Sequence, residues 1–390
     1  MIYIITLLVC VFCSLHFDVK NKTHNKELSY RLLLIWFIAV SGLQYMMGTD
    51  MESYMQWYQT LSLKNWSFQN LISSNKQYQP GWMALCYICR FISDDFVLLK
   101  LIQAIFVNIS VFLFFKRETK YIFTTVSMYA LMSYLVVNFN LMRQSFALGF
   151  ALYAFTYLKM KDYKKYYFFV FLAYMFHNSA FILILLPLLT CFKFVKRYPY
   201  TLIILFLAII SVLASVNLEN LLINVLQSNY LGESITELGT SYMSHSRLGV
   251  QEADFSIFSI HRLLIIAVVV YYISKYKDGY NGILGFAYVL LLIVTSFLPI
   301  LWRFRLYIDF SFYIILARVV VELSRKCQQK NKLFVYLTLF FVFSYFPFRE
   351  YLAPVENSSY RNIDQYYPYH SILNKEHDKR KQYFFNTLTR

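Results

Sequence analysis

Residues 138–144 read Asn-Phe-Asn-Leu-Met-Arg-Gln and separate two apolar runs. Asn138 and Asn140 are both candidates for the N-cap of the helix that follows, because an Asn side chain accepts hydrogen bonds from the first turn. Arg143 then falls in that first turn, where the helix dipole disfavours a cation by about 0.3–1 kcal/mol. A bound anion would turn this conflict into a binding site. The plainer alternative is an interfacial arginine that reaches lipid phosphates.

The composition predicts an all-α, polytopic integral membrane protein. Of the 390 residues, 58% are hydrophobic and 15% charged, and the mean hydropathy is +0.47. Soluble domains carry roughly 25% charged residues. Several apolar runs reach the roughly 20 residues that span a bilayer. The runs are 2–17, 30–47, 80–93, 97–115, 121–137, 143–158, 166–192, 199–216, 257–273, 283–299, 304–323 and 333–348.

Short basic clusters between the runs set the expected orientation. They lie at 18–31, 116–120, 159–165, 193–197, 275–277 and 325–332. The positive-inside rule places them on the cytoplasmic side. The net charge of +16 could indicate a surface that binds nucleic acid. We attribute it to these loops instead, since the chain has no RNA-binding motif.

Two runs do not fit full spans. Both flanks of 166–192 are basic, so we predict a hairpin of two short arms with His177 near its tip. The run 80–93, opened by Pro80 and Gly81, is predicted to be a short re-entrant or interfacial helix on the outer side. Non-helical backbone at membrane depth needs a protein-lined or watery cavity. The sum is about ten spans plus these two short elements, with the N-terminus outside.

The remaining organisation is simple. Residues 1–390 are predicted to form a single transmembrane domain. A large extracytoplasmic loop covers 217–256, and helix parity places the C-terminal tail, 349–390, on the outer side. The two Cys-x-x-Cys pairs, at 10–13 and 86–89, lie in apolar helical sequence and are interpreted as buried hydrophobes.

Candidate chemistry lies on the outer side. Asp50 follows the second run, within a Thr49-x-x-Glu52 pattern that a helix capping box also explains. His177 lies at the predicted hairpin break, where Asn178 or Ser179 could cap the second arm. An ionisable group within a membrane is a functional candidate, and a histidine titrates near neutrality.

Four arginines lie at outer ends of helices: Arg143, Arg262, Arg303 and Arg305. Arginine grips phosphates through a planar set of donors, so the group fits a pyrophosphate. Anchoring to lipid headgroups is the alternative. No nucleotide-binding loop or metal-ligand cluster is present in the sequence, so we expect no metal and no cofactor.

Motifs in the first half resemble the EpsG family, the Wzy-type polymerases of bacterial exopolysaccharide, capsule and O-antigen synthesis. They are G-T-D-M-E-S-Y (48–54), Q-P-G-W (79–82), N-L-M-R-Q-S-F-A (140–147) and A-Y-M-F-H-N-S-A (173–180), with Arg303 and Y-P-Y (367–369) fitting more loosely. The resemblance implies a metal-independent glycosyltransferase with a fold like the GT-C type. It would move a glycan from undecaprenyl diphosphate onto the non-reducing end of another lipid-linked repeat unit, at the outer face of the bacterial cytoplasmic membrane.

Under this hypothesis the donor diphosphate binds arginines, and a base deprotonates the acceptor hydroxyl. The candidates are Asp50 and His177 for catalysis and Arg143, Gln144, Arg303, Arg305, Asn140 and Tyr54 for substrate binding. The expected partners are the lipid-linked oligosaccharide, the lipid bilayer and a chain-length regulator. Two alternatives stay open: an O-antigen ligase or other lipid-linked-sugar glycosyltransferase, and a flippase or transporter, which broken helices also fit.

Overall fold

The computed structural model describes residues 2–63, 78–189, 257–276, 278–298, 301–328, 330–355, 358–375 and 378–388. Throughout these residues the regular structure is helical, with isolated β-bridges only at Gln44–Ser371 and Pro354–Arg361. The all-α prediction is confirmed. The chain groups into two compact units, Met1–Ile184 with Val320–Arg390 and Leu185–Val319.

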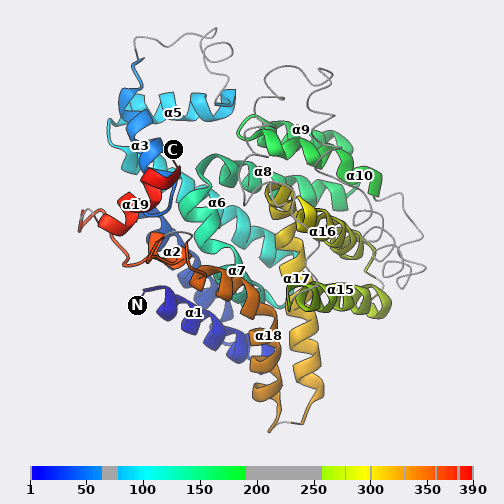
Figure 1. Cartoon of the computed structure of the whole chain (residues 1–390). Coiled ribbons are helices and arrows are strands. Elements are labelled where there is room, and N and C mark those ends of the chain that lie inside the picture. Colours follow the sequence, from blue (N-terminus) through cyan, green and yellow to red (C-terminus); the bar gives the residue numbers. More distant parts are fainter. Residues whose placement is uncertain are drawn as a thin grey trace. The chain divides into compact units, whose positions relative to one another are not determined.

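The first unit holds most of the described helices (Figure 1). They are α1 (Ile2–Cys13), α2 (Lys26–Gly42), α3 (Met51–Thr60), α5 (Pro80–Ile92), α6 (Phe96–Glu118), α7 (Ile122–Met132), α8 (Met142–Lys159), α9 (Tyr163–Tyr174), α18 (Lys332–Leu352) and α19 (Lys379–Leu388). α6 is central, because it packs against α2, α7 and α8. α1 and α18 cover α7, and α9 covers α8.

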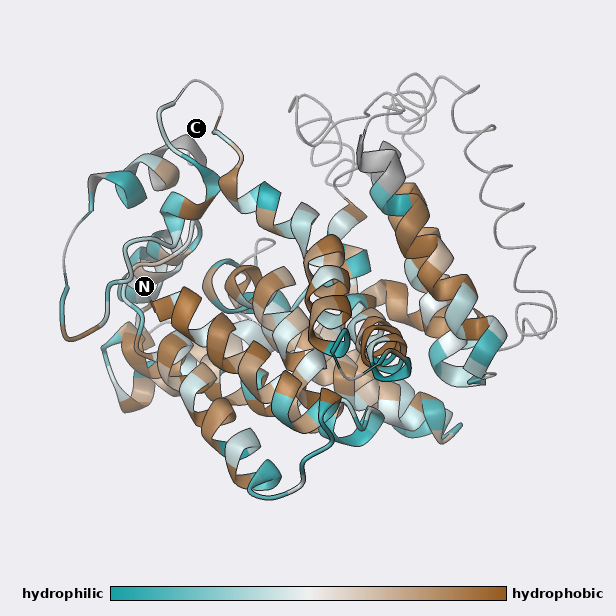
Figure 2. Ribbon diagram, turned by 90° about the horizontal axis from the view of Figure 1, so that it is seen from below, coloured by the Kyte–Doolittle hydropathy of each residue, from teal (hydrophilic) through white to brown (hydrophobic). Residues whose placement is uncertain are grey.

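Several helices of this unit carry apolar side chains on their outer faces. Ile4, Leu8 and Phe12 recur every four residues along α1 and are about two-thirds exposed (66%, 63% and 67%). Phe334 and Phe341 of α18 are 72% and 63% exposed. Figure 2 shows hydrophobic helix bodies with hydrophilic residues gathered at helix ends and connections. Exposed apolar faces of this kind fit a lipid environment.

Two helical segments in the described part of the chain are long and apolar enough to cross a bilayer, Ile2–Val19 and Phe96–Glu118. The first joins α1 to a π-helix, Ser14–Val19. The described residues also include apolar helical stretches of 10–17 residues, among them α5 with 13 and α7 with 11. The expectation of about ten spans is therefore not confirmed and stays a prediction.

The basic connections meet at one end of the first unit, which we call the basic end. Lys116 Nζ lies 2.6 Å from Glu27, and Lys159 Nζ lies 2.7 Å from Glu118. The Lys26 ammonium group donates to the carbonyl of Lys120 (3.3 Å). These contacts join connections that are far apart in sequence. The positive-inside rule predicts that such basic connections lie on the same side of a membrane.

The opposite end of this unit, the motif end, collects the segments singled out in the sequence. α2 begins at the basic end, whereas α6 and α8 finish there with Glu118 and Lys159. The end of α2 and the starts of α6 and α8 therefore lie at the motif end. The C-terminal tail also docks here, because Tyr45 N donates to His370 O and Ile372 N to Leu43 O (both 2.9 Å). The tail and the residues that follow α2 thus share one end, while the outer location of the tail stays a prediction.

The helix break at His177 is confirmed. α9 ends at Tyr174, and a 3-10 helix, Asn178–Leu185, follows. The hydroxyl of Tyr166, near the start of α9, donates to Leu183 O (2.5 Å), so the second arm runs back along the first. The predicted short helix after Pro80 is confirmed too, since α5 begins at that proline.

The second unit contains α10 (Leu186–Leu189), α15 (Ile257–Tyr276), α16 (Gly279–Phe297) and most of α17 (Trp302–Lys326). α15 packs against α16, and the ring of Tyr288 stacks on that of Phe312 at 4.1 Å. Asp278 caps α16 by accepting from Asn281 N (3.2 Å). The predicted loop at 217–256 and the run 199–216 lie outside the described residues.

Candidate active site

The turn that leads into α8 is built differently from the sequence expectation. A π-helix, Val136–Asn140, precedes it, and Leu141 rather than either asparagine occupies the N-cap position. The predicted asparagine cap is therefore wrong. Asn138 cannot serve because its buried side chain donates to Tyr129 Oη (2.7 Å) and accepts from Asn108 Nδ2 (3.0 Å). π-helical turns are uncommon and frequently occur at functional sites.

Asn140 is held against the residues after α2 by the C-terminal tail. Its Nδ2 donates to Gln365 Oε1 (3.0 Å), while Gln365 O accepts from Gly48 N (3.1 Å). One tail residue thus fixes two motif segments. The Oδ1 atom of Asn140 is buried and has no hydrogen-bond partner within the described part of the chain. The sequence motifs gave no sign of Gln365, because its role depends on a contact between distant segments.

Gly48 must be a glycine. Its φ is +91°, a conformation that L side chains rarely adopt. A Cβ there would lie 2.3 Å from Asn140 Oδ1 and 2.4 Å from Phe139 O. The close approach of Gly48 to the turn before α8 explains why the motif at 48–54 begins with this residue.

We expect Gly48→Ala to lower the thermal midpoint of the purified protein by several degrees. Left-handed backbone strain and a clash with backbone atoms cost on the order of 1–3 kcal/mol. Gly282→Ala in α16 is the control, since its Cβ would meet only the side chain of Ile273 at 3.3 Å. An equal midpoint for Gly48→Ala and wild type would show that the loop does not need this conformation.

Arg143, at the second position of α8, is clamped by side chains from two other motifs. Its Nε donates to Tyr54 Oη (2.9 Å) and its Nη1 to Gln79 Oε1 (3.2 Å). The guanidinium carbon also lies 4.8 Å from the ring centre of Tyr78. Burial raises the pKa of Tyr54, and the Arg143 guanidinium only partly offsets this, so the hydroxyl keeps its proton while its oxygen accepts from Arg143. These contacts fix the plane of the guanidinium.

Asp50 belongs to the same group of residues. It is the N-cap of α3, but its side chain makes no capping hydrogen bond, so the predicted Thr49–Glu52 capping box is wrong. Thr49 instead donates its hydroxyl to Asp50 Oδ1 (3.1 Å). Burial is the main cause of the raised pKa of both Tyr54 and Tyr78, and the Asp50 carboxylate adds to it. The carboxylate therefore lies within electrostatic reach of the tyrosines around Arg143.

The hairpin tip joins this group through the start of α5. Gly81 N donates to Met175 O (2.8 Å), and a Cβ on Gly81 would lie 2.7 Å from that oxygen. The ring of Phe176 stacks on that of Phe146, one turn after Arg143, with centroids 5.1 Å apart. Met175 and Phe176 are thus held against α5 and α8, and His177 follows them directly in the chain.

The ring of His177 is oriented by its neighbour. Its Nδ1 accepts from Ser179 N (3.2 Å) and lies 2.7 Å from Ser179 Oγ. Because a backbone N–H can only donate, the neutral imidazole carries its proton on Nε2. Ser179 thus contacts His177 with both its backbone and its hydroxyl. In that tautomer Nε2 is a donor.

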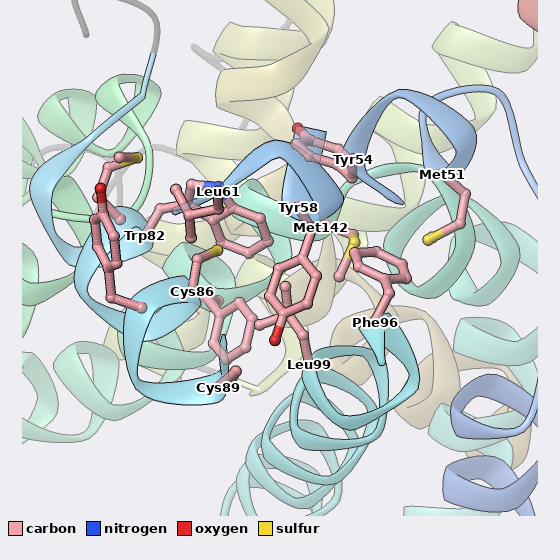
Figure 3. Packing of buried hydrophobic residues seen from close by; sticks show 13 residues of the cluster. Met51, Tyr54, Tyr58, Leu61, Trp82, Cys86, Cys89, Phe96, Leu99 and Met142 are labelled. Carbon is pink, nitrogen blue, oxygen red and sulfur yellow. The ribbon is translucent and has the colours of Figure 1, made fainter. Parts of the chain in front are cut away.

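A hydrophobic cluster supports these residues (Figure 3). It gathers Met51, Tyr54, Tyr58 and Leu61 around α3, Trp82, Met83, Cys86, Tyr87 and Cys89 from α5, Phe96 and Leu99 from α6, and Met142 and Phe146 from α8. The second Cys-x-x-Cys pair is buried inside the cluster, as the interpretation as buried hydrophobes predicted. All four motif segments thus rest on one apolar base.

Sequence reasoning missed Lys100. This α6 residue is only 2% exposed, and its Nζ donates to Gln103 Oε1 (2.6 Å) and to Asn138 O. The ammonium also lies 5.6 Å from the ring centre of Phe139. In the described part of the chain it has no acidic partner, so it is costly to bury. Its contacts tie α6 to the turn before Arg143. A lone lysine inside an apolar run was the available signal.

We expect Lys100→Met to keep or raise the thermal midpoint while it lowers activity by about tenfold. Replacing a buried charge with an apolar side chain of similar volume is often neutral or stabilising. The turn before Arg143 would, however, lose its anchor, and losing an oriented contact costs about 10–100-fold. Lys116→Met, which breaks the exposed pair with Glu27, is the control for altered charge. Full activity in Lys100→Met would mean that the buried lysine does not position the turn.

The other candidate arginines lie in the second unit. Arg303 and Arg305 are in the first turn of α17, as predicted. Arg305 Nε lies 3.5 Å from Asp309 Oδ1, so its charge is partly offset within its own helix. Arg262 is in the second turn of α15.

Gln144, beside Arg143 in the first unit, is buried (1% exposed). A shared cavity of Arg143, His177 and Arg303 stays a prediction.

A sequence model of the EpsG family matches residues 27–371, which covers all four motif segments and most of the chain. The chain belongs to the EpsG family. No curated protein and no solved structure matches it significantly. As an EpsG-family protein it is a membrane protein of polysaccharide biosynthesis. The match ends at Ser371, so it includes Gln365 and the tail segment that docks at the motif end.

Proposed function

We propose that this EpsG-family protein is a polysaccharide repeat-unit polymerase. It transfers a glycan carried on undecaprenyl diphosphate onto the non-reducing end of another lipid-linked repeat unit. The observation that supports this best is the clamp on Arg143, whose guanidinium is held by Tyr54 and Gln79 and stacked near Tyr78. Arginine with a fixed plane suits bidentate contact with a phosphate.

In this proposal Arg143 receives the charge of the departing diphosphate. The acceptor hydroxyl loses its proton and its oxygen bonds to the anomeric carbon. The bond from that carbon to the diphosphate oxygen breaks, and the electron pair leaves with the lipid diphosphate. Donors aimed at developing charge are usually the largest catalytic contribution. Arg303 of the second unit is proposed to assist, more than Arg305, because Asp309 already offsets the charge of Arg305.

Asp50 is proposed as the base and His177 as a positioning donor. The assignment follows from hydrogen bonding, because Nδ1 of His177 accepts from Ser179 N, which puts the proton of a neutral ring on Nε2. Asp50 is the carboxylate whose charge acts on Tyr54 and Tyr78, the tyrosines around Arg143. Asn140, Gln144 and Tyr54 complete the substrate-binding set.

The membrane arrangement is part of the same proposal. The motif end faces outward and the basic end faces the cytoplasm, in accordance with the positive-inside rule. About ten spans cross the bacterial cytoplasmic membrane in a GT-C-like arrangement, and the hairpin at His177 and helix α5 are re-entrant or interfacial. A chain-length regulator is the proposed protein partner, and O-antigen, capsule or exopolysaccharide the product class.

The test is the lipid-linked glycan profile of a strain without this protein. We expect single repeat units on the outer leaflet, and a ladder of longer glycans once the wild-type chain is restored. Lipid-linked polymer that persists without the protein would indicate a ligase. Single units confined to the inner leaflet would indicate a flippase. Either result would overturn the polymerase proposal.

A further inference from the structure

A cavity of about 580 Å³ opens at the basic end of the first unit, away from the motif end. It lies between the π-helical extension of α1, Ser14–Val19, with the residues that follow it, and the end of α17 and the start of α18. Four cationic side chains line it: Lys20, Lys22, Arg325 and Lys332. Phe12 and Leu333 form part of its apolar wall, and no acidic residue is among those that line it.

These cations differ from their neighbours at the same end. Lys116, Lys159 and Lys165 each pair with a carboxylate at 2.6–3.2 Å. Lys20, Lys22 and Lys332, in contrast, have no acidic partner among the residues that the structure describes. Acidic side chains thus neutralise the nearby basic loops but leave the cavity positive. Clustered cations without a counter-charge repel one another, so an anion in the cavity would be stabilised.

Arg325 is held in place for such a ligand. Its Nε donates to Asp18 O (3.0 Å), its Nη2 donates to Asn21 Oδ1 (3.0 Å), and its guanidinium carbon lies 5.3 Å from the ring centre of Tyr121. An ordered guanidinium loses little entropy when it binds. α18 begins at Lys332 without a side-chain cap, so the positive end of its dipole also lies at the cavity.

The apolar surroundings decide between a soluble anion and a lipid. Phe12 is 67% exposed, and the exposed side chain of Leu8 (63%) continues the same face along α1. Leu333 and Phe334 of α18 are 51% and 72% exposed. A soluble phosphate would gain nothing from these surfaces, whereas acyl chains would cover them.

We propose that this cavity binds the phosphate headgroup of an anionic phospholipid, with its acyl chains lying along the exposed faces of α1 and α18. The site is separate from the proposed polymerase site and does not depend on it. Each lysine near a membrane surface contributes attraction to anionic lipid of about 1 kcal/mol.

The experiment measures lipid binding to the full chain purified in detergent, with phosphatidylglycerol as the anionic probe and phosphatidylcholine as the neutral one. The triple variant Lys20→Gln/Lys22→Gln/Lys332→Gln is expected to bind phosphatidylglycerol on the order of 100-fold more weakly than wild type. Its control, Lys116→Gln/Lys159→Gln/Lys165→Gln, removes the same charge from paired lysines and should change affinity by less than about threefold.

Three results would overturn the proposal. They are an equal loss in the control variant, equal binding of phosphatidylcholine to wild type, and binding of inorganic phosphate as tight as that of phosphatidylglycerol. The last would assign the cavity to a soluble anion. If the triple variant does not fold, Lys332→Gln alone decides, with an expected loss of about fivefold against none in Lys116→Gln.

Discussion

Replacing Arg143 with alanine is expected to lower the rate of polymer formation by a factor on the order of 10²–10³, the usual cost of removing a donor to developing charge. Arg143→Lys should recover little of this. The lysine keeps the charge but cannot donate to Tyr54 and Gln79 together while it presents a flat pair of donors to a diphosphate. The measurement is the initial rate of ladder formation from lipid-linked repeat units, at matched protein level.

Arg90 provides the matched control. It lies in α5 of the same unit, with its guanidinium 5.5 Å from the ring centre of Tyr58 and 3.3 Å from Asp94. Arg90→Lys therefore makes the same chemical change to a stacked, paired arginine and should keep the rate within about twofold, because lysine keeps the charge opposite the exposed Asp94 carboxylate. If the Arg143→Lys variant also forms polymer at the wild-type rate, Arg143 does not act through bidentate contact with the diphosphate.

Asp50→Asn is expected to reduce the rate by a factor on the order of 10²–10⁴, which is the usual contribution of a general base. The amide is nearly isosteric but cannot take the acceptor proton. Glu52→Gln is the control, because this acid lies two residues along and its side chain accepts from Gln56 Nε2 (3.3 Å) within the same helix. It should leave the rate unchanged. A wild-type rate in Asp50→Asn would remove Asp50 from the mechanism.

The same assay separates the roles of Asp50 and His177. If His177 donates a hydrogen bond from Nε2, then His177→Gln keeps a donor and should outperform His177→Ala by about tenfold, the worth of one such bond to a charged group. If His177 is the base instead, glutamine and alanine should be equally slow. Equal rates in these two variants would transfer the base role to the histidine.

Local sequence patterns predicted what depends on local chain properties. The break at His177 and the short helix at Pro80 followed from the length of apolar runs between basic flanks. The N-cap at Asn138 was wrong because side chains from other parts of the bundle, Asn108 and Tyr129, bond to it. The capping box at Thr49 was wrong because Asp50 occupies the N-cap position and Thr49 donates to its carboxylate. Such competition is invisible in a single local pattern.

The sequence predicted which residues belong to the candidate site, but not which of them contact one another. The motifs at 48–54, 79–82 and 140–147 were identified separately, whereas their meeting at Arg143 required the fold. Lys100 and Gln365 act through backbone and amide contacts with segments 38 and more than 200 residues away, so no spacing rule could find them. For Arg303, the family resemblance remains the basis of its assignment.

The most direct test of the account is the affinity of the purified protein for undecaprenyl diphosphate, measured for wild type, Arg143→Lys and Arg90→Lys. Loss of bidentate contact with a charged phosphate costs on the order of 2 kcal/mol, or about 30-fold in affinity. We therefore predict binding about 30-fold weaker in Arg143→Lys and unchanged in Arg90→Lys. Equal affinity in all three proteins would contradict the claim that the clamped Arg143 holds the donor diphosphate.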